Sequence, residues 1–166
     1  MSNIVMPPQH LCEFRIEKDG SDARTLIAQT RRTFFVSEFT EAMTRAPEFI
    51  IGPKENAVIR VFTCETLGVT GWFETEFFGP KGFEHIKKFG LVPCLSDDAF
   101  AVRVAHTAQE LNEWIRVAHT HIFVRSCHAM FHVGHNRGFG RHVNGYFLNS
   151  DLRLNPGDLV ALRVAN

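Results

Sequence analysis

The chain lacks several features that would assign it to a class of protein at once. It has no apolar run approaching the roughly 18 residues of a membrane span. It has no net charge either, because 18 Lys and Arg balance 18 Asp and Glu. The opening residues, Met1-Ser-Asn-Ile-Val-Met-Pro-Pro, show neither the basic nor the apolar stretch of a secretory signal. These absences predict a cytoplasmic protein without a membrane partner.

Cysteine is present, but in no spacing that suggests a metal site or a redox pair. The four cysteines are widely separated in the chain: Cys12, Cys64, Cys94 and Cys127. No C-x-x-C motif is formed, so we expect reduced and mostly buried thiols. The sequence leaves any cofactor open.

The apolar content is high enough for a folded core. Hydrophobic residues make up 45% of the 166 residues, and 16 of the residues are Phe. At this length one domain is expected. We predict a flexible N-terminal tail at 1–9 and a single domain at 10–166.

Local patterns predict both strands and helices. Strands are expected at 11–17, 33–36, 57–64, 70–78, 99–105, 121–133, 146–148 and 159–164. Helices are expected at 21–30, 38–45, 83–89 and 108–119. The helix at 108–119 depends on a capping box formed by Thr107 and Glu110. Together these elements predict a compact α+β domain, with a mostly antiparallel sheet, two to four helices and a β-rich C-terminal third.

Charge is unevenly distributed along the chain. Residues 1–113 contain 12 basic and 16 acidic side chains, whereas 114–150 contain four arginines and no acid. The same acid-free segment holds six of the nine histidines. This composition is typical of an anion-binding surface, which becomes more positive below about pH 6.5.

Within that segment, residues 134–145 form a glycine-rich run that we interpret as a loop. Its backbone amides and side chains provide donors for a phosphate, and one aromatic ring is placed to stack on a base. The candidate ligand-binding residues are Arg137, Arg141, His135, His142, Asn136 and Phe139. We therefore expect a phosphate-bearing ligand, either a nucleotide or a nucleic acid. The alternative is a floppy loop that happens to be basic.

Two histidines of this segment are candidates for acid–base catalysis. If 121–125 and 128–133 form a hairpin that turns at Ser126-Cys127, His121 lies opposite His132, with Arg125 on the same face. Such a group suits a hydrolase that cleaves a phosphoester, because one imidazole accepts a proton while the other donates one. If 121–133 is one strand instead, the two histidines point to opposite faces.

Two other interpretations of the histidines stay open. His119 and His121, joined by His132 or His135, would supply three imidazoles to a zinc ion in a metalloenzyme. The segment offers no carboxylate to orient them, however. The remaining interpretation is structural, with histidines that lie at the edge of the core.

A dense aromatic cluster suggests a different class of function. It comprises Trp72, Phe73, Phe77 and Phe78. If exposed, it would serve an interaction or inhibitor protein, such as a phage or mobile-element accessory protein, or a homo-oligomer. Glu74 and Glu76 in the same segment are expected on the solvated face of a strand. Whether the protein is an enzyme is left open.

Overall fold

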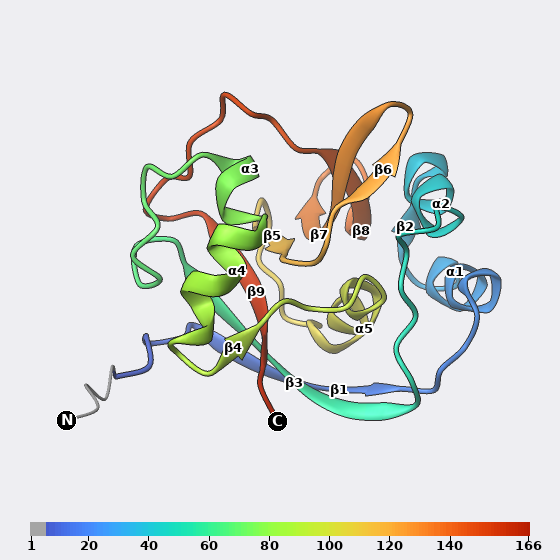
Figure 1. Ribbon diagram of the computed structural model, residues 1–166. Helices are drawn as coiled ribbons and strands as arrows, with labels where there is room; N and C mark the ends of the chain where they lie inside the picture. The colour runs from blue at the N-terminus through green and yellow to red at the C-terminus, as the bar shows by residue number, and fades with distance from the viewer. Residues whose placement is uncertain (1–5) are drawn as a thin grey trace.

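The computed structural model describes residues 6–166, which contain five helices and nine strands (Figure 1). The helices are α1 (Ala23–Arg31), α2 (Glu38–Thr44), α3 (Glu74–Phe77), α4 (Pro80–Lys87) and α5 (Asp98–Ala105). The strands are β1 (Cys12–Lys18), β2 (Phe35–Val36), β3 (Glu55–Thr63), β4 (Leu91–Val92), β5 (Trp114–Val117), β6 (Ile122–Val124), β7 (Cys127–Asn136), β8 (Gly140–Phe147) and β9 (Leu159–Val164). The predicted tail at 1–9 falls partly outside the described residues, which exclude 1–5.

All nine strands belong to one sheet, in the order β1-β3-β9-β5-β7-β8-β2, with β4 also paired to β9 and β6 to β7. The sheet is mixed, because β5 runs parallel to β9 and β2 runs parallel to β8. It curves into a half-barrel around α5 (Figure 1). The predicted α+β class is therefore confirmed. The sheet is less uniformly antiparallel than expected, and the described residues contain five helices rather than two to four.

Apolar side chains pack on both faces of the sheet. On the concave face, residues such as Ile115, Phe131 and Val143 join a core with Phe100 of α5. On the convex face, a second cluster that includes Phe77 and Ile86 forms under α3 and α4. These two short helices cover only part of the convex face. Trp114 of β5, Phe35 of β2 and Phe139 between β7 and β8 remain exposed, and the candidate site lies around them.

Two sequence predictions near the middle of the chain are wrong. Residues 99–105 form the helix α5 rather than a strand, and the segment after Thr107 contains a turn and the strand β5 rather than a helix. The first segment is apolar at nearly every position, so alternation alone does not distinguish strand from helix. In the second, Ile115 and Val117 are buried where β5 pairs with β7 and β9, and this pairing overrides the capping box.

Other predictions differ in detail. α1 begins at Ala23 rather than at 21, because Asp22 caps it by accepting from the Thr25 amide at 2.8 Å, and Ser37 caps α2. The segment 70–78 contains the short helix α3 instead of a strand, so Glu74 and Glu76 do not share a face. All four cysteines are free, and only Cys64 and Cys94 are fully buried. Within residues 6–166, no helix is both long and apolar enough to cross a membrane.

Candidate functional site

The glycine-rich run at 134–145 is an ordered hairpin rather than a loop. β7 and β8 pair without interruption from Ala129↔Phe147 to Asn136↔Gly140. The Asn136 side chain accepts from the Phe139 amide at 2.7 Å, and Gly140 has a φ of 64°. A glycine in the left-handed region after a three-residue loop is a common way to close a hairpin. Asn136 thus shapes the turn instead of facing a ligand.

Aromatic side chains form a row across four strands at this end of the sheet. Trp114 lies opposite Gly134, Gly134 opposite His142, and His142 beside Phe35 of β2. Directly paired residues project from the same face, so these positions share the convex face. Phe139 folds back from the hairpin tip and stacks on Phe35, with ring centroids 4.4 Å apart. Trp114, Phe35, Phe139 and His142 are called the aromatic row below.

Three rings of the aromatic row are displayed to solvent. Trp114 is 42% exposed, Phe35 38% and Phe139 50%. Apolar side chains of this size are usually buried. A contiguous set of exposed rings on one sheet face is typical of binding surfaces.

A pair of buried histidines forms the centre of this surface. The Nε2 atoms of His132 and His142 lie 3.3 Å apart, and His142 Nδ1 donates to the Gly140 carbonyl at 3.0 Å. A Cβ at Gly134 would come within 2.6 Å of His142 Nε2, so only glycine leaves room for this ring. Because His142 Nδ1 carries the proton, His132 Nε2 donates to His142 and His132 Nδ1 has no partner among the described residues.

Both imidazoles are neutral at pH 7. Burial, the neighbouring His142 and Arg116 lower the pKa of His132 to about 3. Burial also lowers the pKa of His142, with a further contribution from Arg103. The centre of the aromatic row is therefore polar but uncharged.

An ion pair anchors the sheet beneath Trp114. Arg116 Nε donates to Glu74 at 3.1 Å, and the other Glu74 oxygen accepts from the Asn149 amide at 3.0 Å. Asp158 lies 3.6 Å from the same guanidinium. Glu74 is buried, so the prediction that it lies on a solvated face is wrong. Its carboxylate matches the charge of Arg116 and ties α3 to β5.

The two arginines of the glycine-rich run lie near the hairpin tip but on different sides of it. Arg137 and Arg141 are exposed, and neither forms an ion pair within residues 6–166. Arg141 lies opposite His135 on the concave side, where His135 Nδ1 donates to the Gln109 carbonyl at 2.9 Å. The predicted ligand-binding residues therefore lie in different places. His142 and Phe139 lie on the aromatic row, Arg137 at the tip, and Arg141 with His135 on the other side.

A buried arginine adds to the positive charge near the tip. Arg103 of α5 is fully buried and donates only to neutral acceptors, the side chain of Gln109 and the carbonyls of Gly134 and His106. Burial and the neighbouring Arg141 lower its pKa to about 10, so it stays charged at pH 7. Arg103 escapes prediction from the sequence, because the strand expected at 99–105 gives it no place near the site.

The structure does not bring the three predicted catalytic residues together. A hairpin of β6 and β7 does form, but its turn is Arg125-Ser126, both with positive φ, and Ile122 pairs with Ala129. This register differs from the predicted one and places the His121 ring 5.4 Å from that of His128. His128 and His132 are four residues apart on β7, about 13 Å. The predicted pairing of His121 with His132 is therefore wrong.

The metal interpretation finds no support in the side-chain geometry. No group of three or more His, Cys, Asp or Glu side chains within residues 6–166 is arranged to hold a metal ion. His119 donates to the Thr120 carbonyl at 2.7 Å and accepts from the Phe131 amide at 3.0 Å. Burial lowers its pKa to about 4. Both of its nitrogens are used, so His119 is a structural residue.

A second charged cluster lies at the far end of the sheet. Lys18 Nζ donates to Asp97 at 2.7 Å and to Asp98 at 2.9 Å, and Arg163 bridges Asp98 and Glu55 at 2.9 Å. Lys18, Asp97 and Asp98 are buried. We call these five residues the ion cluster. From the sequence alone, Asp97-Asp98 resembles an ordinary turn without a further role.

Comparison of the chain with family models, with curated proteins and with solved structures found no match. The geometry of the site therefore carries the functional inference.

Proposed function

We propose that the protein binds single-stranded nucleic acid, with bases on the aromatic row and phosphates at the hairpin tip. The observation that carries this proposal is the set of three exposed rings, on β5, β2 and the β7–β8 tip, that share one face of the sheet. A single nucleotide is the smallest ligand that offers both a base and a phosphate.

The spacing of the rings suits more than one base. Trp114 and Phe35 lie on strands three positions apart in the sheet order, about 14 Å. Phe139 provides a third ring over Phe35. Stacking of a base on an exposed aromatic ring is worth about 1–3 kcal/mol and tolerates any base. The neutral His132–His142 pair is buried between the rings and adds no charge to this surface.

Charge on the adjoining hairpin favours an anionic backbone. Arg137 and Arg141 have no carboxylate partner within residues 6–166, and residues 114–150 contain no acid. Phosphate contacts of this kind release counter-ions, so binding must weaken as salt rises. Cleavage of the ligand is left out of the proposal, since His121 and His132 do not adjoin.

The proposal is tested by fluorescence anisotropy with labelled single strands of about twelve nucleotides, as DNA and as RNA, in about 50 mM salt. We expect saturable binding that weakens at least about fivefold in Phe35→Ala and in Phe139→Ala. Phe123→Ala is the matched control, because Phe123 is 51% exposed but lies on the β6–β7 hairpin. Absence of binding, or equal losses in the control, would refute the proposal.

A further inference from the structure

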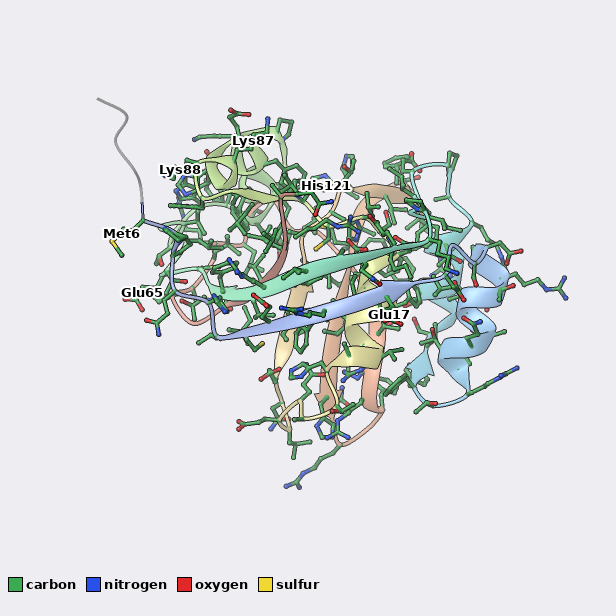
Figure 2. All side chains as sticks on the ribbon, turned by 90° about the horizontal axis from the view of Figure 1, so that it is seen from below. Met6, Glu17, Glu65, Lys87, Lys88 and His121 are labelled. Carbon is green, nitrogen blue, oxygen red and sulfur yellow. The ribbon has the colours of Figure 1, made fainter. Side chains whose placement is uncertain are left out.

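Within residues 6–166, no strand pairs with the outer edge of β1. β1 pairs with β3 over seven consecutive residues, from Cys12↔Val61 to Lys18↔Glu55, and it is the first strand in the sheet order. The opposite edge of the sheet, β2, is only two residues long. Figure 2 shows β1 as an outer strand, with Glu17 near its end. No proline or bulge interrupts β1, so its unpaired backbone groups are able to accept another strand.

A large cleft runs along this free edge. Its volume is about 1300 Å³, and its walls are β1, one face of α1, one face of α5 and the segment before β2. The apolar part of the wall is formed by Leu26, Phe34, Phe100 and Val104. Small-molecule sites usually measure about 300–1,000 Å³, so this cleft is larger than such a ligand needs.

We propose that the cleft receives an extended segment of a partner polypeptide, which pairs with the free edge of β1. Strand addition to an open sheet edge gains affinity from main-chain hydrogen bonds and specificity from pockets for alternate side chains. Here the strand edge and the apolar pockets adjoin each other, because α1 and α5 flank β1 where the half-barrel does not close.

The side chains around β1 define the chemistry of the partner. Arg15 and Glu17 are exposed, whereas Ile16 and Lys18 are buried. An added strand would place an acidic residue beside Arg15 and a basic residue beside Glu17, because opposite charges stabilise neighbouring strands. Its alternate residues would be apolar and face the apolar wall of the cleft. The partner segment is therefore amphipathic, with alternating apolar and charged residues.

The ion cluster ends the cleft on one side. Lys18 is already held by Asp97 and Asp98, so it is not free to bind a small anion.

The proposal is tested by selecting, from a displayed library of random linear peptides of about ten residues, those that bind the intact chain. We expect enriched peptides with alternating apolar residues, whose binding falls at least about tenfold in Val104→Glu, because the new charge would be buried on binding. Val104 is 58% exposed, so the variant should fold, and thermal unfolding checks this. Leu111→Glu is the control, since Leu111 is 43% exposed and lies outside the cleft.

Hydrogen exchange on the peptide complex decides whether pairing occurs. Protection of the β1 amides is expected on binding. The proposal is overturned if no peptide is enriched, if the peptides bind Val104→Glu as well as the wild type, or if peptide binding does not protect the β1 amides from exchange. It is also overturned if light scattering shows a dimer that Val104→Glu dissociates, because the occupant would then be a second copy. Oligonucleotide binding should be unchanged in Val104→Glu, so the two sites are tested separately.

Discussion

The ion cluster and the surroundings of the aromatic row differ in whether their charged groups have partners of opposite charge. In the ion cluster, two cations and three carboxylates are held together by hydrogen bonds. Burial alone would lower the pKa of Lys18, but its bonds to Asp97 and Asp98 raise it. Every charge there has an internal partner.

At the aromatic row, the buried titratable groups are kept neutral instead. His132 and His142 are buried and uncharged at pH 7, while Arg137 and Arg141 are exposed without carboxylate partners within residues 6–166. The difference suggests separate roles. Matched buried charges hold the fold, whereas displayed rings and unmatched surface charges are available to a ligand.

Removing one charge from the ion cluster should have the largest effect on stability. Asp98→Asn leaves Lys18 and Arg163 buried with one carboxylate fewer, and we expect a loss of about 3–5 kcal/mol in the free energy of unfolding. Urea denaturation measures it. Glu13→Gln, which breaks the partly exposed pair with Arg60, is the control and should change stability little, because solvent screens this pair. An equally small loss of stability in Asp98→Asn would show that the ion cluster contributes little to the stability of the fold.

Acid should destabilise the protein through its neutral buried histidines. In the folded state the pKa of His132 is about 3 and that of His119 about 4, whereas unfolded histidine has a pKa of about 6.5. Below about pH 6.5 the unfolded state therefore binds more protons, and unfolding becomes easier as pH falls. By pH 5 each histidine should reduce the free energy of unfolding by up to about 2 kcal/mol.

Urea titrations at several pH values between about 7.5 and 5 check this expectation in the wild type and in His132→Gln. The variant should lose less stability on acidification, because it has one titratable group fewer at the site. An identical pH dependence in the two proteins would mean that folding does not lower the pKa of His132.

Replacement of the tip arginines should affect binding but not folding. Arg137→Ala with Arg141→Ala is expected to weaken oligonucleotide binding about tenfold and to reduce the salt slope by up to about 0.7 for each phosphate that is no longer neutralised. Stability should change by less than about 0.5 kcal/mol. Arg15→Ala with Arg24→Ala, two exposed arginines elsewhere, serves as the control. An unchanged salt slope in the tip variant would argue against phosphate binding there.

Loss of one ring from the aromatic row should have a modest effect on stability. Phe139→Ala removes the stacking on Phe35 and should cost about 0.5–1.5 kcal/mol of stability, because Phe139 is half exposed. Thermal unfolding measures the change. A loss above about 3 kcal/mol would instead make Phe139 a core residue, and its exposure would then not indicate a binding role.

The sequence predicts those elements whose patterns are local. The alternation at 11–17 gives β1, and the Ser37 cap starts α2, because burial and capping act within a few residues. The helix at 98–105 and the strand at 114–117 are the reverse of what their local patterns predict. Their state depends on the half-barrel that surrounds them, which no local pattern reveals.

The candidate site is predictable only in part for the same reason. The acid-free composition of 114–150 points to the segment that contains most of the candidate site, but Phe35, Arg103 and Glu74 come from other parts of the chain. The turn at Arg125-Ser126 also escapes prediction, since both residues adopt a positive φ that side chains usually avoid. That one-residue difference in the turn separates His121 from His132.

Fluorescence of Trp114 tests the central claim most directly. The chain contains two tryptophans, so Trp72→Phe leaves Trp114 as the only reporter. Titration of this variant with a single-stranded oligonucleotide should quench Trp114 in a saturable way, and the quenching should weaken as salt rises from about 50 to 200 mM. If the oligonucleotide binds without altering Trp114 fluorescence, or does not bind at all, the aromatic row is not its binding surface.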